Sequence, residues 1–308
     1  MNELVTVFGG GGFLGRYVVQ ELLRSGARVR IAGREPLDAH FLKPLSALGQ
    51  AQSVRADITR PETLGPAVQG AGAVINLVGI LDGKFDAVHV DGARNAARAA
   101  ASAGAGRFVQ VSAIGAAPQA ASAYSRTKGL GEQAVRDAFP AAAIVRPSIL
   151  FGPEDGFVNR FAAMIALAPV VPVVRPGVRL QPVWVVDAAR AIARLALSPV
   201  AAAEIFELGG PQILTMIELY RWIGEAIARE PKYFPLPDVV AAAIARLGWL
   251  PGTPITWDQW LTLQEDNVVH AGAKGFAEIG IDPAPLAAVA PAWLVRYRRH
   301  GRFSLNAA

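Results

Sequence analysis

Residues 4–15 read LVTVFGGGGFLG. The first five of them, Leu4–Phe8, are mostly β-branched or aromatic, which predicts a short buried strand. The segment Phe13–Ser25 predicts a helix that ends before Gly26. A glycine-rich turn between a strand and a helix lets a nucleotide pyrophosphate approach bare backbone at the helix N-terminus. We therefore expect a dinucleotide site whose contacts come from Gly9, Gly12, Phe13, Leu14 and Gly15.

Two spacings of the glycine turn fit this site. One is Gly10-x-Gly12-x-x-Gly15, and the other is Gly9-x-x-Gly12-x-x-Gly15. In either spacing the first glycine allows the tight turn, the middle one admits the pyrophosphate, and the third lets helix and strand pack closely. The sequence leaves both spacings open.

Short β-branched runs alternate with helical segments over the first two-thirds of the chain. Strands are predicted at Leu4–Phe8, Arg28–Ala32, Gln52–Arg55, Ala73–Val78, Arg107–Ser112, Ala143–Arg146, Pro182–Val186 and Ile205–Leu208. Helices are predicted at Phe85–Ala103 and Tyr124–Ala138, with capping-box spacings at Thr215-x-x-Glu218 and Thr256-x-x-Gln259. This alternation predicts an α/β fold with a doubly wound parallel sheet of the Rossmann type. We expect a nucleotide-binding domain over residues 1–150 and a smaller, mostly helical C-terminal region over 151–308 that returns some strands to the sheet.

The end of the second predicted strand bears on the choice of nucleotide. An NAD site usually places an acidic residue there, about 20 residues after the glycine turn, against the ribose 2′-hydroxyl. Gly33 and Arg34 stand at this place, and a guanidinium suits a 2′-phosphate. The next residue, Glu35, would return an acid to the site if the alignment shifted by one. We favour Arg34 and NADP(H) over NAD(H).

A tyrosine and a lysine share one face of the predicted helix Tyr124–Ala138. The spacing Tyr124-x-x-x-Lys128 places the two side chains one turn apart. In hydride chemistry a tyrosine can protonate a nascent alkoxide if a nearby ammonium lowers its pKa toward neutrality. Ser112 closes the fifth predicted strand and is the third candidate catalytic residue. Its alternative role is to cap the following loop.

Composition excludes several classes of site. The chain of 308 residues is 52% apolar and 18% charged and has no cysteine, which excludes a disulfide framework, a thiolate zinc site and an iron–sulfur cluster. Its four histidines lack ligand spacing, so we expect no metal. The net charge of +5 is weak support for nucleic-acid binding, and we expect none. We expect a reducing, aqueous compartment, the cytoplasm.

Together these residues resemble the short-chain dehydrogenase/reductases in their extended or atypical branch. The resemblance implies that Asp57 and Ile58 contact the adenine end, that Leu77 and Gly79 line the cofactor after the fourth strand, and that Pro147 passes the nicotinamide. It also assigns Tyr124 and Lys128 to both catalysis and cofactor binding. One departure concerns the residues after Ser112: active members usually carry a further Ser or Thr where this chain has Ala113-Ile114.

Several strings are similar to a narrower group, the NAD(P)H-binding accessory subunit of respiratory complex I and its bacterial relatives. They include residues 6–19, 74–79, 135–140, 151–159 and 181–187. This resemblance implies a mainly structural nucleotide, partner subunits in NADH:quinone oxidoreductase, and a peripheral place on the cytoplasmic face of the inner membrane. The alternatives are a free NADP-dependent reductase or epimerase acting on a small carbonyl or nucleotide sugar, and a redox-sensing regulator.

The C-terminal third is apolar and rich in tryptophan. Val239–Leu250 is followed by Trp257, Trp260 and Trp293, and the basic tail holds Arg296, Arg298, Arg299, His300 and Arg302. Tryptophan is enriched at protein interfaces and at membrane headgroups. We expect this region to dock on an acidic partner or anionic lipid, the alternative being that it completes its own core.

Overall fold

The computed structural model describes residues 3–198, 202–250, 253, 255–299 and 301. The chain divides into two compact units that alternate along the sequence. The first unit consists of residues 1–147, 185–208 and 270–282, and the second of residues 148–184, 209–269 and 283–308. The chain therefore leaves the first unit at residue 147 and returns to it twice.

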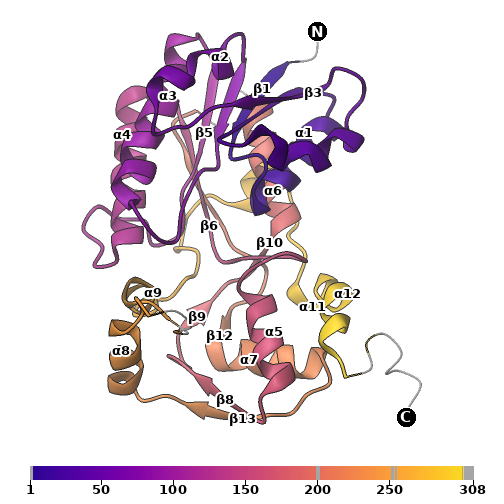
Figure 1. The fold of residues 1–308 in the computed structure, drawn as a ribbon, viewed down its shortest axis with the longest axis vertical. Coiled ribbons are helices and arrows are strands. Elements are labelled where there is room, and N and C mark those ends of the chain that lie inside the picture. Colours follow the sequence, from indigo (N-terminus) through magenta and orange to yellow (C-terminus); the bar gives the residue numbers. More distant parts are fainter. Residues whose placement is uncertain (1–2, 199–201, 251–252, 254, 300, 302–308) are drawn as a thin grey trace. The chain divides into compact units, whose positions relative to one another are not determined.

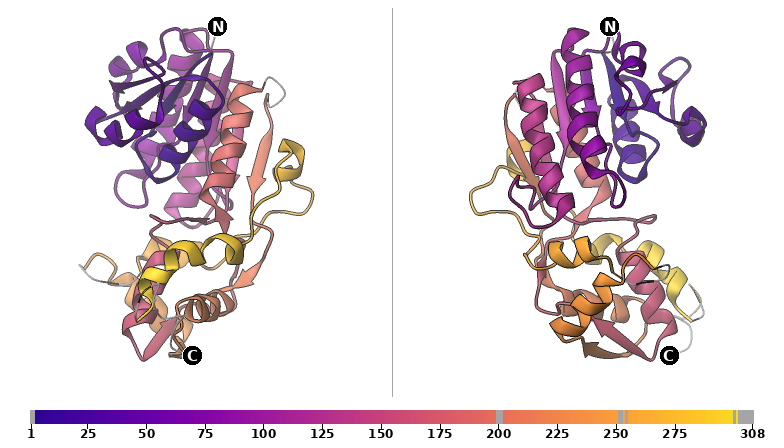
Figure 2. Two further views of the ribbon diagram at one scale, coloured as in Figure 1. Left: turned by 90° about the vertical axis from the view of Figure 1, so that its right-hand side faces the viewer. Right: turned by 60° about the vertical axis from the view of Figure 1, so that its left-hand side comes forward.

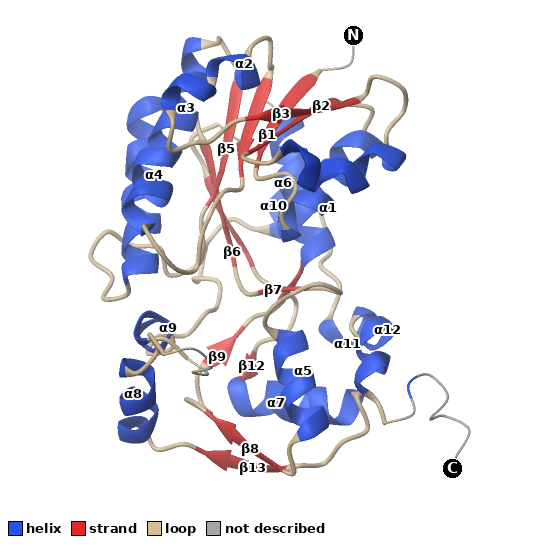
Figure 3. Ribbon diagram, in the orientation of Figure 1, coloured by secondary structure: helices blue, strands red, loops and turns tan. Residues whose placement is uncertain are grey.

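A seven-stranded parallel sheet forms the centre of the first unit (Figures 1 and 3). Its strands, in spatial order, are β3 (Ala51–Arg55), β2 (Arg28–Gly33), β1 (Leu4–Phe8), β4 (Ala73–Asn76), β5 (Arg107–Val111), β6 (Ala143–Pro147) and β11 (Ile205–Leu208). The order reverses between β1 and β4, where Val5 pairs with Val29 on one side and Ala73 on the other. Ligands of such sheets bind beyond the carboxyl ends of the strands at this reversal. The predicted doubly wound α/β fold is confirmed.

Helices cover both faces of this sheet (Figure 2). Those on one face are α1 (Phe13–Arg24) and α6 (Val185–Leu197), and those on the other are α3 (Ala93–Ser102) and α4 (Ala123–Ala138). The shorter elements of this unit are η1 (Pro36–Leu45), η2 (Pro61–Thr63), α2 (Gly65–Val68), η3 (Asp86–Gly92) and α10 (Phe276–Ile279). α1 buries Val18, Val19 and Leu22 at helical spacing, so its apolar stripe faces the sheet.

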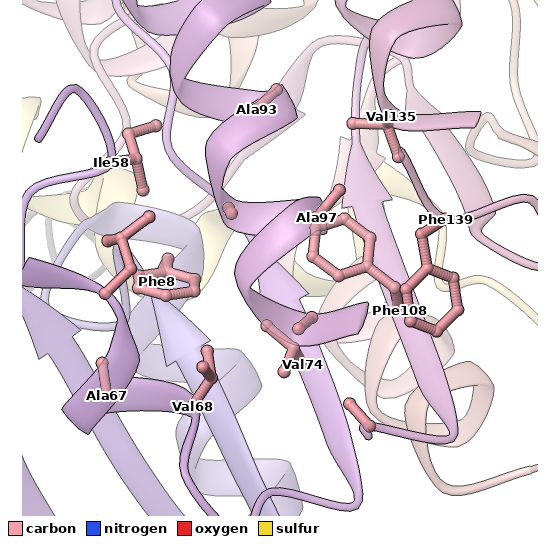
Figure 4. Packing of buried hydrophobic residues seen from close by; sticks show 14 of the residues in the cluster. Phe8, Ile58, Ala67, Val68, Val74, Ala93, Ala97, Phe108, Val135 and Phe139 are labelled. Carbon is pink, nitrogen blue, oxygen red and sulfur yellow. The ribbon is translucent and has the colours of Figure 1, made fainter. Parts of the chain in front are cut away.

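The core beneath α3 and α4 is built largely from small side chains (Figure 4). Ala93, Ala97 and Ala100 of α3 are at most 1% exposed, which lets the helix lie close to the sheet. Phe108 of β5 and Phe139 fill the remaining space, with ring centroids 5.7 Å apart. This packing fixes the carboxyl ends of β1, β4 and β5, which position the site.

The second unit has short strands and helices around a separate core. Its strands are β7 (Leu150–Phe151), β8 (Val170–Val173), β9 (Arg179–Leu180), β10 (Val183–Trp184), β12 (Leu214–Thr215) and β13 (Lys232–Pro235). Its helices are α5 (Val158–Leu167), α7 (Met216–Ala226), α8 (Asp238–Arg246), α9 (Trp257–Thr262), α11 (Leu286–Val289), α12 (Pro291–Leu294) and η5 (Val295–Tyr297). Both predicted capping boxes are confirmed, at Thr215 with Glu218 and at Thr256 with Gln259.

Two predicted elements differ from the structure by more than one or two end residues. The strand predicted at Pro182–Val186 contains only the two residues of β10, and α6 begins at Val185, where the acidic Asp187 lies in its first turn. The helix predicted at Phe85–Ala103 is split into a π-helix, η3, and the α-helix α3. None of the helices in the described part of the chain is long and apolar enough to span a membrane.

Candidate nucleotide-binding site

The glycine turn joins β1 to α1 at the reversal point of the sheet. Gly9 has φ +79°, a left-handed conformation that glycine adopts without steric cost, and its N–H donates to Ala32 O at 3.0 Å. A Cβ on Gly15 would lie 2.7 Å from the Gly10 Cα, so only glycine lets α1 approach the turn this closely. This geometry fits the spacing Gly9-x-x-Gly12-x-x-Gly15.

The N-terminus of α1 is open to an anion. Its N-cap is the exposed Gly12, which provides no side-chain cap, and Phe13 and Leu14 begin the first turn half-buried. The first N–H groups of a helix have no partner within the helix, and the helix dipole favours negative charge there. The exposed N-cap and the bare Gly9–Gly12 backbone therefore fit the pyrophosphate of NAD(P)H.

Two residues of opposite charge follow β2 and differ in their neighbours. Arg34 is exposed, and its positive charge acts on the Asp57 carboxylate. Glu35 forms an ion pair with Arg55, with 3.9 Å between Glu35 Oε1 and Arg55 Nη2. Both side chains of that second pair are well exposed, so the pair itself contributes little stability.

Asp57 and Ile58 follow β3 and have different environments. Burial alone would raise the pKa of the Asp57 carboxyl, but hydrogen bonds from Thr59 and the charges of nearby arginines outweigh it. The net effect holds the pKa of Asp57 below its usual range, so Asp57 is ionised at neutral pH. Ile58 has its side chain in the hydrophobic core, and its carbonyl accepts a hydrogen bond from Asn95 Nδ2 at 3.0 Å.

The loop after β4 extends the sheet toward the site. Leu77 N–H donates to Phe8 O at 3.0 Å, which continues the pairing with β1 by one residue. The fully buried Asn76 holds the loop through Val78 N–H, which donates to its Oδ1 at 3.2 Å. Gly79 follows with an exposed backbone.

Tyr124 and Lys128 lie on the first turns of α4, whose N-cap Ser122 accepts a hydrogen bond from Ser125 N–H. The Lys128 ammonium is buried, donates to Val111 O at 3.1 Å and lies 6.0 Å from the centre of the Tyr124 ring. A Cβ on Gly79 would lie 3.1 Å from Lys128 Nζ, which places the loop after β4 against this ammonium. The loop and the Tyr124–Lys128 pair thus form one site.

The charge states of this pair are set mainly by burial. Burial lowers the pKa of Lys128 to about 8, against the opposing charge of Glu132. Burial raises the pKa of Tyr124 to about 12. The ammonium, 6.0 Å from the Tyr124 ring, does not bring the Tyr124 pKa toward neutrality in this structure, because loss of solvent dominates. The phenol keeps its proton at neutral pH.

Ser112 directly follows β5, and Pro147 is the last residue of the neighbouring strand β6. Ser112 is buried, and its N–H donates to Val145 O at 2.7 Å. Its hydroxyl is buried without a hydrogen-bond partner among the described residues. Pro147 is buried at the end of β6, and its carbonyl accepts from Ile114 N–H at 3.1 Å. Buried hydroxyl groups normally have a hydrogen-bond partner. The Ser112 hydroxyl is next in the chain to Val111, whose carbonyl binds Lys128, so it fits a site that takes a polar ligand.

The sequence interpretation missed His89, which is 3% exposed and lies beside the Tyr124–Lys128 pair. Its ring stacks on Phe85 with centroids 5.4 Å apart and meets the Tyr124 ring edge-on at 5.5 Å. Burial, with the nearby charge of Lys128, lowers the pKa of His89 to about 3, so the ring is neutral. The one signal in the sequence was the Phe85–His89 spacing, which places two rings together on a helix.

A largely buried network of ion pairs, which the sequence analysis did not predict, links α4 to the sheet. Arg146 of β6 donates to both carboxylate oxygens of Glu132, at 2.9 and 2.6 Å, and reaches Glu207 of β11 at 3.4 Å. The N–H and ring of His270 bond the same Glu207. These contacts tie α4 to two strands and hold the Tyr124–Lys128 turn in place.

Known proteins match the chain over most of its length. A family model described as NAD(P)H-binding matches residues 9–158. The NADH dehydrogenase (ubiquinone) 1 alpha subcomplex subunit 9 of Rattus norvegicus, a mitochondrial protein, is 35% identical over 92% of this chain and 77% of its own length. The mitochondrial 40 kDa subunit of NADH-ubiquinone oxidoreductase of Neurospora crassa is 30% identical over 100% of this chain and 83% of its own.

The chain belongs to the family of the NAD(P)H-binding accessory subunit of respiratory complex I. A bacterial relative, the ceramide reductase of Caulobacter vibrioides, is 33% identical over 76% of this chain and 74% of its own length. The NADPH-dependent quinone oxidoreductase of Escherichia coli, solved with NADPH, shares the fold, with a TM-score of 0.78 at 19% identity over 94% of this chain and 99% of that one. This likeness shows the fold, and the two mitochondrial relatives confirm the resemblance to the accessory subunit of complex I.

Proposed function

We propose that this chain binds NADP(H), mainly as a structural element, and serves as an accessory subunit of a membrane-bound NADH:quinone oxidoreductase. The observation that carries this proposal is the 35% identity with the rat subunit over 92% of the chain. The glycine cradle supports it, because Gly9 and Gly15 keep the backbone form that a pyrophosphate needs. Its place would be peripheral, on the cytoplasmic face of the inner membrane.

In this proposal the nucleotide extends over the carboxyl ends of the central strands. The Gly12 end of α1 holds the pyrophosphate, and Lys128 holds the nicotinamide ribose from the far side. The remaining contacts come from Phe13, Leu14, Arg34, Asp57, the backbone of Ile58, Leu77, Gly79, Tyr124 and Pro147. When bound, the nicotinamide supplies a hydride, and an accessory subunit need not use it.

The surroundings of Arg34 support NADP(H) over NAD(H). Glu35, the residue that would accept a ribose 2′-hydroxyl, is directed to Arg55. Arg34 remains exposed at the end of β2, beside Asp57. A guanidinium there binds a 2′-phosphate through charge-assisted hydrogen bonds, which NADH cannot form.

Arg34→Ala is expected to weaken NADPH binding about 10- to 100-fold, since hydrogen bonds to a charged group contribute about 1.5–3 kcal/mol. Binding of NADH should not change. The measurement is calorimetric titration of both nucleotides. Arg28→Ala, at the opposite end of the same strand, is the matched control and should leave both affinities as they are. Equal affinity of the wild-type protein for NADPH and NADH would contradict the assignment.

The second unit supports a contact with a partner or membrane. Val239 of α8 is 83% exposed and Trp249 is 77% exposed, whereas Trp260 is buried in the unit's own core. Part of the region therefore completes its own core, and the α8 end leaves apolar surface uncovered. Arg296 and Arg298 bond backbone carbonyls of this unit. His300 and Arg302 of the predicted basic tail lie outside the described residues.

A second candidate is a free NADP-dependent reductase or epimerase. Two observations favour it. Lys128 donates to the carbonyl of Val111, the chain neighbour of Ser112, whose buried hydroxyl has no hydrogen-bond partner among the described residues. One relative is named a ceramide reductase. The Tyr124 phenol, protonated at neutral pH, could donate its proton to a carbonyl oxygen that Ser112 polarises. Steady NADPH oxidation with a carbonyl substrate, abolished by Tyr124→Phe, would establish this candidate and overturn the structural role. Tight NADPH binding without turnover supports the accessory subunit.

A further inference from the structure

The buried His89 has one defined tautomer. Ile80 N–H donates to His89 Nε2 at 3.0 Å, so Nε2 is an acceptor and the proton of the neutral ring is on Nδ1. Nδ1 lies 3.0 Å from Thr127 Oγ1, which itself donates to Ala123 O at 2.7 Å. The ring thus joins the loop after β4 to α4 through a continuous chain of hydrogen bonds.

The backbone around His89 is unusual and brings it close to α4. It lies in the seven-residue π-helix η3, a conformation that is rare and frequently found at functional sites. Gly131 of α4 packs on the His89 carbonyl oxygen, which a Cβ at that position would overlap. The π-helix and the glycine together set the ring between the loop after β4 and the first turns of α4.

The groups on either side of the ring are those assigned to the nicotinamide end. A Cβ on Gly79 would lie 3.7 Å from His89 Nε2 and 3.1 Å from Lys128 Nζ, so both side chains border the space that a side chain at Gly79 would fill. Tyr124 meets the ring of His89 edge-on. A shift of His89 would therefore move the loop and the ammonium relative to each other.

We propose that His89 is a positioning residue that joins Ile80 to Thr127 and so holds Gly79 and Lys128 at the spacing that the nicotinamide ribose requires. This inference rests on the proposed binding of NADP(H). The inference predicts an effect at the nicotinamide end of the nucleotide and none at the adenine end, because His89 acts only on groups on the nicotinamide side of the pyrophosphate. The adenine end, at Arg34 and Asp57, belongs to the opposite side of the reversal point.

The test compares NADPH with 2′,5′-ADP, which carries the adenine and the 2′-phosphate but no nicotinamide. His89→Phe keeps a ring and removes both hydrogen bonds. We expect it to weaken NADPH binding about tenfold and to leave 2′,5′-ADP binding unchanged. His89→Gln, whose amide can accept from Ile80 N–H, should restore most of the NADPH affinity. Thr127→Val removes the partner of Nδ1, together with the hydroxyl's own bond to Ala123 O, but keeps the bond from Ile80, and should weaken NADPH binding in the same direction by a smaller factor.

The outcomes separate the inference from the proposed function. An equal loss of affinity for both ligands would mean that His89 supports the fold generally, and no loss for either would mean that it positions nothing. Each of these results overturns the inference. If His89→Phe does not fold, the same comparison with Thr127→Val decides. A wild-type protein that binds neither ligand would instead overturn the proposed function.

Discussion

Gly15→Ala is expected to abolish NADPH binding and to lower the free energy of unfolding by about 3 kcal/mol. The added Cβ would lie 2.7 Å from the Gly10 Cα and overlap the Gly9 carbonyl oxygen. These are backbone atoms of the turn itself, so α1 must move away from β1 to make room. The movement displaces the helix N-terminus that receives the pyrophosphate. Denaturant unfolding and NADPH titration measure the two effects.

Two alanine variants serve as controls for Gly15→Ala. Gly65→Ala adds a Cβ with no neighbour within 4 Å and should leave both stability and binding unchanged. At Gly12 a Cβ would lie 3.3 Å from Gly9 O and reach solvent, so Gly12→Ala should weaken binding while costing less than about 1 kcal/mol of stability. A Gly15→Ala protein with wild-type NADPH affinity would show that the nucleotide binds elsewhere.

Acid is expected to destabilise the first unit through His89. Burial lowers the pKa of His89 to about 3, whereas an unfolded histidine titrates near 6.5. Between these values the unfolded chain binds a proton that the folded chain does not, so the free energy of unfolding falls as the pH drops from 6.5 toward 3. The contribution from this residue reaches up to about 5 kcal/mol, at 1.36 kcal/mol for each pH unit.

His89→Gln isolates this contribution. The glutamine cannot titrate but can keep the hydrogen bond from Ile80, while all other titrating groups are shared with the wild type. The difference in unfolding free energy between the two proteins should therefore change steadily from pH 6.5 to pH 4, as chemical denaturation at each pH would measure. Parallel curves for the two proteins would show that His89 is already charged, or accessible, in the folded state.

Much of the first unit could be predicted because its signals are local. The strand Leu4–Phe8 and the helix from Phe13 follow from residue type and periodicity, and the glycine turn between them identifies the nucleotide class. The pair Tyr124–Lys128 was visible from its spacing alone, because four residues make one helical turn. Such features need no knowledge of the rest of the chain.

The remaining features of the site depend on contacts between distant segments. His89 matters because Ile80 and Thr127 meet it from two elements, and it lies in a π-helix that periodicity does not reveal. Likewise, Arg146 joins Glu132 to Glu207 across 75 positions of sequence, which no spacing rule predicts. The rise in the Tyr124 pKa has the same origin, since burial is a property of the folded unit.

The second unit was predicted least well, for a related reason. Prolines interrupt its periodicity, and its strands are mostly two residues long, which leaves little local pattern. Trp257 and Trp260 are three residues apart on the short helix α9 but differ in burial: Trp260 is buried in the unit's own core, whereas Trp257 is 39% exposed beside Arg246.

The most direct test of the accessory-subunit proposal is native electrophoresis of membranes from cells that produce this chain, extracted with a mild detergent. The band that contains the chain is identified by mass spectrometry, and nucleotide released from it on denaturation is measured. We expect the chain to migrate with the subunits of NADH:quinone oxidoreductase and to release NADP(H). A chain that migrates only as a free species, and leaves the membranes in a low-salt wash, would contradict the proposal.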